Sequence, residues 1–129
     1  MNGQEQADFF TKRVELGRKG EEIAADFLED AGYNILKRNY RIGHSDIDVL
    51  AQNRETLVFV EVRTKSKGDN GMPEDSLTAK KLKRMRHTAE LYIAFHNYKG
   101  PARLDAVCII LNDSDRVTHL EHYTGVLSK

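Results

Sequence analysis

Two carboxylates interrupt the most strand-like part of the sequence, the segment IDVLAQNRETLVFVEVRTK at residues 47–65. Asp48 and Glu61 lie inside apolar runs, whereas charged residues more often stand where a strand ends. If residues 54 and 55 form a two-residue turn, Asp48 lies directly opposite Glu61, with Cβ atoms roughly 5 Å apart. A slip of one residue would place the two carboxylates on opposite faces of the sheet, so this expectation depends on the register.

Carboxylates at that distance repel each other unless one is protonated or a cation lies between them. An all-oxygen site suits a hard divalent ion, so we expect Asp48 and Glu61 to hold Mg²⁺ or Mn²⁺ together with water. Arg63 and Lys65 follow Glu61 on the same face of the strand. A metal that activates water, beside a cation that offsets negative charge, is what phosphodiester hydrolysis requires. An alternative stays open, in which Glu61 pairs with Arg63 or a lysine and Asp48 only ends a strand early.

The surrounding pattern predicts the elements that must position these residues. Apolar residues recur at helical spacing over residues 14–31, and a second helix is expected from residue 76 or 78 to about 97. Turn-forming residues predict a loop over 66–76. The segments that favour strands are 33–40, 46–52, 56–64, 102–111 and 116–123. This order predicts an α/β domain with one mixed sheet flanked by helices.

Two glycines, Gly17 and Gly20, interrupt the first predicted helix, where each costs about 1 kcal/mol relative to alanine. A close approach of this helix to the sheet or to a phosphate would explain both. Alternatively, the helix begins only after Gly20.

The composition limits the class of protein. The chain has 129 residues, 40% of them hydrophobic, which favours a single domain over residues 1–129 with residues 1–12 flexible. Its 20 basic and 20 acidic residues balance, which argues against a uniformly basic nucleic-acid coat protein but permits a local basic patch. Cys108 is the single cysteine, so the sequence predicts no disulfide within the chain and no cysteine-based zinc site. No segment resembles a signal peptide or a membrane span, so we expect a cytoplasmic protein without membrane association.

The pieces around the two carboxylates resemble the PD-(D/E)XK nuclease superfamily. The matching features are D-x(12)-E-x-R on a predicted hairpin and a preceding helix that carries a glutamate. More narrowly, the chain is similar to the YraN-type family of predicted endonucleases, which is distantly related to archaeal Holliday junction resolvases. This similarity runs from about Leu16 to Tyr123 and rests on GRKGEEIAADFLEDAGYNILKRNYR, SDIDVLA, LVFVEVRTK, the lysine-rich start of the second helix, and RLDAV. It implies a restriction-endonuclease-like fold.

The resemblance also implies a role for individual residues. Glu21 matches the helix carboxylate of such nucleases, Asp48 and Glu61 match the metal-binding acids, and Arg63 takes the position of the motif lysine. Because a guanidinium cannot act as a general base, Arg63 is expected to stabilise charge or bind phosphate. Lys81 matches a basic residue of the second helix.

A dense basic run, KKLKRMR, begins the second predicted helix at residues 80–86. Such runs commonly form a solvated helix face, but this one follows the basic residues of the 63–67 segment and adds to a local excess of positive charge. Positive charge beside an acidic site is how proteins bind a phosphate backbone. The residues expected to contact nucleic acid are Arg63, Lys65, Lys80, Lys81 and Arg84.

The leading hypothesis is therefore a metal-dependent endonuclease that hydrolyses phosphodiester bonds in structured or branched DNA. Its catalytic residues would be Glu21, Asp48, Glu61 and Arg63. The alternative is a nucleic-acid-binding module that keeps the nuclease scaffold without cleaving, and a third reading is a protein-interaction domain. The expected partner is nucleic acid, most naturally DNA, and a homodimer would suit paired cuts on a symmetric junction.

Overall fold

The computed structural model describes residues 1–126 of the chain. Its elements follow the predicted order, and a short 3₁₀ helix lies inside the predicted loop. They are α1 (Gly3–Asp30), β1 (Asn34–Ile42), β2 (Ser45–Asn53), β3 (Thr56–Ser66), η1 (Pro73–Ser76), α2 (Ala79–Phe95), β4 (Ala102–Leu111) and β5 (Val117–Tyr123).

The five strands form one mixed sheet in the order β1-β2-β3-β4-β5. Neighbouring strands are antiparallel except for β3 and β4, which run parallel and are joined through α2. A parallel pair needs such a long crossover connection. The predicted mixed sheet with flanking helices is confirmed, and the arrangement is consistent with a restriction-endonuclease-like fold.

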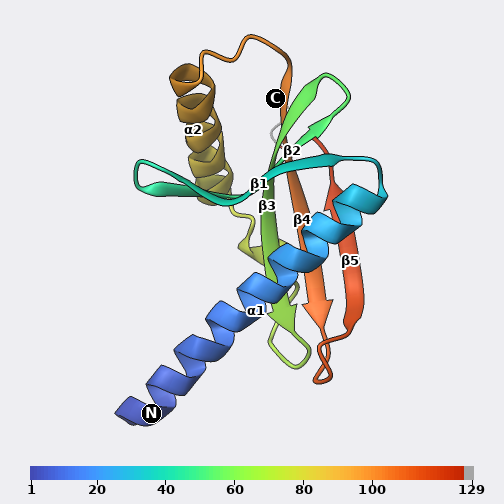
Figure 1. Cartoon of the computed structure of the whole chain (residues 1–129). Helices are drawn as coiled ribbons and strands as arrows, with labels where there is room; N and C mark the ends of the chain where they lie inside the picture. The colour runs from blue at the N-terminus through green and yellow to red at the C-terminus, as the bar shows by residue number, and fades with distance from the viewer. Residues whose placement is uncertain (127–129) are drawn as a thin grey trace.

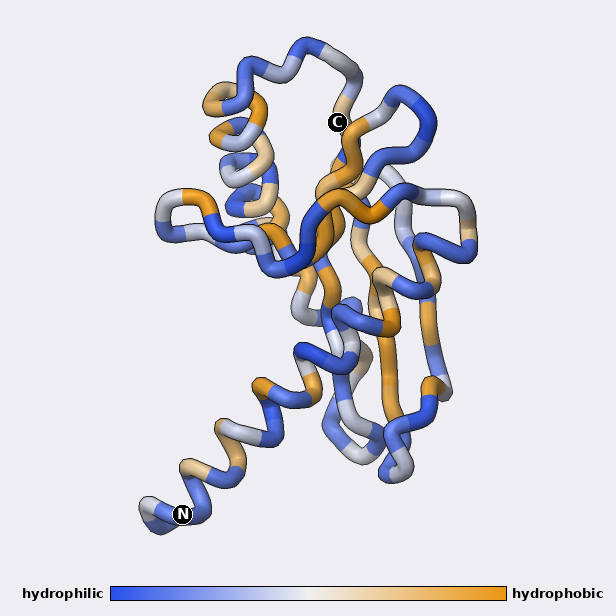
Figure 2. Tube along the Cα trace, viewed as in Figure 1, coloured by the Kyte–Doolittle hydropathy of each residue, from blue (hydrophilic) through white to orange (hydrophobic). Residues whose placement is uncertain are grey.

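The two helices cover opposite faces of the sheet (Figure 1). Because side chains alternate along a strand, each face of β3 contributes to a different core. The core under α1 contains Ala24, Ala25, Leu28, Val49, Ala51, Val58, Val60, Val62, Val107, Ile109 and Leu111. The core under α2 contains Ile47, Leu50, Leu57, Phe59 and Ala89. The hydrophobic residues accordingly concentrate along the central strands, whereas the end of the β2–β3 hairpin is hydrophilic (Figure 2).

Helix α1 begins at Gly3, earlier than the predicted start at Val14. The Asn2 side chain accepts a hydrogen bond from the Glu5 N–H at 2.8 Å, and the Glu5 carboxylate accepts one from the Asn2 N–H at 3.1 Å. This reciprocal capping box satisfies two N–H groups that a helix N-terminus otherwise leaves free. Residues 1–12, expected to be flexible, thus lie mostly within an exposed helical segment that extends beyond the sheet (Figure 1), and their flexibility stays a prediction.

Helix α1 approaches β3 most closely at Gly20. A Cβ atom added at Gly20 would lie 1.8 Å from the Thr64 hydroxyl oxygen, whereas one added at Gly17 would meet no atom within 4 Å. The close approach predicted for this helix is therefore confirmed at Gly20 and not at Gly17. The alternative that the helix starts only after Gly20 is wrong.

Neither helix is long and apolar enough to cross a membrane, as far as the described residues 1–126 extend.

Candidate active site

The register predicted for the β2–β3 hairpin is confirmed. The ladder runs from the pair Asn53–Thr56 to the pair Val49–Val60, so residues 54 and 55 form the turn. Arg54 adopts a φ of 58°, the left-handed conformation that is uncommon outside glycine but recurs in tight hairpin turns. This register directs Asp48 and Glu61 toward the same region.

The ladder ends one pair before Asp48 and Glu61 would meet. Instead, the Asp48 carboxylate accepts a hydrogen bond from the Val62 N–H at 2.9 Å. A side-chain oxygen thus replaces a backbone carbonyl as the acceptor, and regular pairing of β2 with β3 stops at Val49. The two carboxylates consequently lie on neighbouring strands at the point where the ladder opens, and they are not a cross-strand pair.

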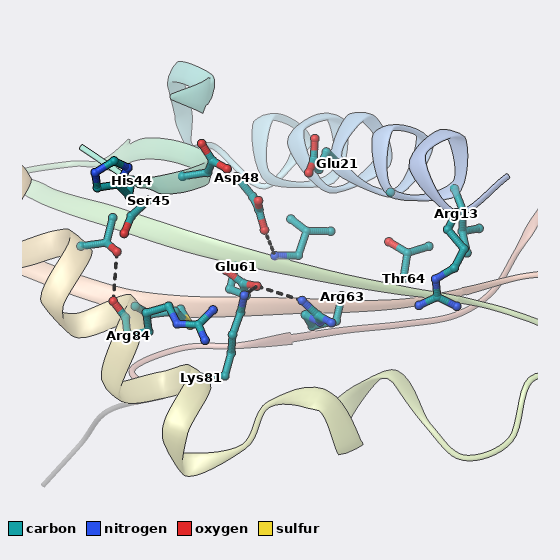
Figure 3. Close-up of a pocket in the computed structure, with 16 residues that line it drawn as sticks. Arg13, Glu21, His44, Ser45, Asp48, Glu61, Arg63, Thr64, Lys81 and Arg84 are labelled. Atoms are coloured by element: carbon teal, nitrogen blue, oxygen red, sulfur yellow. Dashed lines mark hydrogen bonds and ion pairs between the residues drawn. The ribbon is translucent and has the colours of Figure 1, made fainter. Parts of the chain in front are cut away.

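A pocket of about 360 Å³ occupies this opening. Figure 3 shows Glu21 projecting from α1 and Lys81 from α2, on opposite sides of β3, toward the same space. The lining residues are Arg13, Leu16, Gly17, Glu21, His44, Ser45, Asp46, Asp48, Glu61, Val62, Arg63, Thr64, Lys81, Arg84, Met85 and Thr88. The pocket therefore gathers four carboxylates and four permanent cations from both helices and two strands.

Two of the carboxylates have a raised affinity for protons. Burial raises the pKa of Asp48 to about 8, and the negative charge of Glu61 adds to this effect. Burial also raises the pKa of Glu21, with contributions from Glu61 and Asp46, although hydrogen bonds with Asn39 and Asp48 oppose the increase. A cation near Asp48 and Glu21 would lower both pKa values by stabilising the charged forms.

Glu61 has a different environment, because two cations already contact it. Its side chain is only 8% exposed, and its Oε2 atom lies 3.2 Å from Arg63 Nη1 and 3.2 Å from Lys81 Nζ. Arg63 is held from a second side as well, since its Nε donates to the Ser76 hydroxyl at 2.7 Å. The ion pairing that the sequence left open for Glu61 is thus present, with both candidate partners at once.

The remaining predicted contact residues divide into two groups. Arg84 lines the pocket, as do Arg63 and Lys81. Lys65 instead directs its ammonium group to the Asn70 carbonyl oxygen in the following loop, and Lys80 is exposed outside the pocket lining.

Sequence reasoning missed several residues that the pocket contains. Arg13 belongs to the part of the chain that precedes the predicted first helix, and the Asn2–Glu5 capping signal would have extended the helix through it. His44 and Ser45 come from the β1–β2 turn and the first residue of β2. No spacing rule in the sequence connects this turn with the hairpin carboxylates.

The donor set fits a hard divalent cation. Asp48 and Glu61 are oxygen donors on adjacent strands, and Glu21 lies within hydrogen-bonding reach of Asp48. Mg²⁺ is commonly bound by one or two carboxylates and keeps several waters. Over residues 1–126, no group of three or more histidine, cysteine, aspartate or glutamate side chains is arranged to surround an ion by itself. The residues that would hold Mg²⁺ or Mn²⁺ here are Asp48 and Glu61.

Comparison with known proteins assigns the chain to a family. The model of the family described as Uncharacterised protein family UPF0102 matches residues 20–109. A UPF0102 protein of Desulfitobacterium hafniense is 46% identical over 99 residues, covering 75% of this chain and 82% of that protein. Relatives in Lawsonia intracellularis and Chlorobium phaeobacteroides are 43% and 39% identical, covering 89% and 86% of this chain and 86% and 92% of their own lengths. The chain therefore belongs to the UPF0102 family, and the resemblance to YraN-type proteins is confirmed.

Proposed function

We propose that this protein is a metal-dependent endonuclease that hydrolyses phosphodiester bonds in structured or branched DNA. The observation that carries the proposal is the meeting of opposite charges in one pocket. Glu21, Asp48 and Glu61 provide carboxylates that attract a divalent cation, and basic side chains surround them. Binding and hydrolysis of a nucleic-acid backbone require both features at once. A cation must lie at the reacting phosphate, and positive groups must contact the neighbouring phosphates.

The residues of the chain would act in distinct ways. When bound, Mg²⁺ or Mn²⁺ would supply an activated water and stabilise charge on the phosphate. Asp48 and Glu61 would hold the ion, and a Glu21 carboxylate oxygen would accept the proton that the attacking water loses. Arg63, fixed between Glu61 and Ser76, would donate hydrogen bonds to a phosphate oxygen and offset its charge.

A second candidate function is nucleic-acid binding without cleavage. It is favoured by the charges of Asp48 and Glu61 when no metal is bound. Arg63 and Lys81 already neutralise Glu61, and the pKa of Asp48 is about 8. These groups then carry a net positive charge at neutral pH, which could bind phosphate without any ion. Arg63 also occupies the position of the motif lysine, and unlike a lysine it cannot act as a general base.

A cleavage assay separates the two functions. The protein would be incubated with a four-way DNA junction and with linear duplex DNA, in Mg²⁺, Mn²⁺ or EDTA. Cleavage that requires metal and disappears in Asp48→Ala supports the endonuclease. Asp113→Ala, in the exposed β4–β5 turn, is the matched control and should cleave like the parent. Binding without cleavage under every condition would support the second function, and neither binding nor cleavage would contradict both.

That the protein forms a homodimer, which would present two pockets to a symmetric junction, stays a prediction. Its cytoplasmic location stays a prediction as well.

A further inference from the structure

Lys81 occupies a position that does not favour its own helix. It lies in the first turn of α2, where its N–H donates to the Thr78 hydroxyl at 3.2 Å. The N-terminus of a helix carries partial positive charge, so acidic residues usually stabilise it and lysines do not. The first turn of α2 contains no acidic residue. The placement of Lys81 is better explained by where its ammonium group goes.

That ammonium group reaches from α2 to β3 and contacts Glu61, and both residues line the pocket (Figure 3). Arg63 and Lys81 both contact the same Glu61 oxygen, Oε2, each at 3.2 Å. Arg63 has a second hydrogen-bond partner in Ser76, at 2.7 Å. Within residues 1–126, the ammonium group of Lys81 has Glu61 as its one ion-pair partner. Displacing Lys81 therefore breaks fewer contacts than displacing Arg63.

A divalent cation bound to Glu61 would change the balance at this carboxylate. Like charges a few ångströms apart repel strongly at a site partly shielded from water. The Lys81 side chain is 28% exposed and ends a flexible four-carbon stem, so it can move without disturbing the backbone. Arg84, one turn further along α2, also lines the pocket and would help a freed Lys81 to attract an anion.

We propose that Lys81 is an exchangeable counterion, which a divalent cation displaces from Glu61 and which then binds a phosphate oxygen of the nucleic acid. This inference rests on the proposed function and adds a coupling to it. Metal releases a phosphate-binding group, and phosphate in turn removes a competitor of the metal. Each ligand therefore raises the affinity for the other by the same factor, as thermodynamic linkage requires.

Mn²⁺ binding tests the inference without any cleavage. Free Mn²⁺ would be measured by electron paramagnetic resonance, with and without dimethyl phosphate, a diester that carries the anionic group and no base. In the parent, the diester should tighten Mn²⁺ binding by about 5-fold or more. Lys81→Met should bind Mn²⁺ by about the same factor more tightly than the parent in the absence of diester, and the diester should then tighten Mn²⁺ binding less than it does in the parent.

Two further variants provide the controls. Lys81→Arg keeps the positive charge, so it should retain the weaker Mn²⁺ affinity and the response to diester. Lys83→Met removes an exposed lysine of the same helix that does not line the pocket, and it should behave like the parent. Lys81→Gln provides a second neutral variant, and thermal melting of each protein verifies that it is folded.

The outcomes distinguish the coupling from the enzyme. If Lys81→Met and Lys81→Gln bind Mn²⁺ no more tightly than the parent, or respond equally to diester, the inference is overturned even in a protein that cleaves DNA. Coupling that depends on Lys81 in a protein that never cleaves would support the inference and count against the endonuclease alone. Absence of Mn²⁺ binding to the parent would overturn both.

Discussion

At the residue scale, Asp48 and Glu61 are neighbours in one pocket that meet opposite electrostatic conditions. Asp48 accepts one backbone hydrogen bond, and burial raises its pKa to about 8. Glu61 is almost fully enclosed but has two cations on a single oxygen. Removal of the charge should therefore have opposite effects on the metal-free protein at the two positions.

Asp48→Asn should stabilise the metal-free protein at alkaline pH. The pKa of Asp48 is about 8 in the folded protein against 3.8 for the free group, so the folded state binds the proton more tightly. The stability that this proton contributes is fully present below about pH 3.8 and is lost as the pH rises through about 8. At pH 9 the variant should exceed the parent by about 1 kcal/mol or more in free energy of unfolding, because each pKa unit corresponds to about 1.4 kcal/mol.

Urea unfolding in EDTA over a series of pH values measures this difference. The amide oxygen of the substituted asparagine can still accept a hydrogen bond from the Val62 N–H, so the hydrogen bond itself is not the variable. A difference between variant and parent that stays constant from pH 4 to pH 9 would contradict the raised pKa.

Glu61→Gln should destabilise the metal-free protein. Arg63 and Lys81 would lose their shared anion, and breaking a largely buried ion pair by removing one partner costs about 1–3 kcal/mol where the other partners can still reach water. Urea unfolding at pH 7 in EDTA measures the loss. Adding Lys81→Met to Glu61→Gln should restore part of the stability, since one unpaired cation is then gone. An unchanged or increased stability in Glu61→Gln alone would show that the two cations do not depend on this carboxylate.

At the element scale, the contact of α1 with β3 at Gly20 holds Glu21 over the pocket. Gly20→Ala should cost about 1–3 kcal/mol, because the new Cβ would lie 1.8 Å from the Thr64 hydroxyl oxygen and 2.8 Å from Thr64 Cβ. Gly17→Ala is the matched control on the same helix. With no atom within 4 Å of its Cβ, it should gain about 0.5–1 kcal/mol from helix propensity. Thermal or urea unfolding measures both.

The contact between Gly20 and Thr64 can also be tested by a second, compensating substitution. Thr64→Ala removes the hydroxyl and methyl groups that the new Cβ would meet but keeps the Thr64 Cβ atom, so it should recover part of the loss in Gly20→Ala. Equal effects of alanine at Gly17 and Gly20 would mean that helix propensity alone, and not close packing, decides both positions.

Much of the fold could be predicted because local pattern and long-range structure agree. The β2–β3 register follows from one turn at residues 54 and 55, since a hairpin propagates its pairing along both strands. The start of α1 was missed although its signal, Asn2 followed by Glu5, is present in the sequence. Residues before Val14 contribute no buried side chain, so a search for an apolar face does not find them.

The site was only partly predictable. Alternation along the hairpin brings Asp48 and Glu61 to one pocket, but the end of the ladder depends on a hydrogen bond from Val62 to a side chain. The contact of Lys81 with Glu61 depends on how α2 lies on the sheet, which no pattern in the sequence specifies. Arg13 lies far from the hairpin in the sequence and reaches the pocket only because α1 is continuous.

At the scale of the whole molecule, the formal net charge is zero, but the charged side chains are distributed unevenly. The pocket collects Arg13 from α1, Arg63 from β3, and Lys81 and Arg84 from α2, in addition to its acids. If DNA binds there, its phosphates release condensed counterions as these cations approach them. Affinity should consequently fall linearly with salt concentration on a double-logarithmic plot.

The slope of that plot tests which cations make the contact. Each phosphate contact removed should reduce the slope by about 0.7–0.9, so Arg13→Gln and Arg84→Gln should each flatten it by roughly that amount. Lys99→Gln is the matched control, because Lys99 is exposed before β4, near the Leu57 end of β3 and away from the pocket residues at its other end. Fluorescence anisotropy with labelled DNA in EDTA gives the slopes. A similar flattening in Lys99→Gln would mean that DNA senses the surface charge as a whole, and a slope near zero in the parent would place the nucleic acid elsewhere or exclude it as the partner.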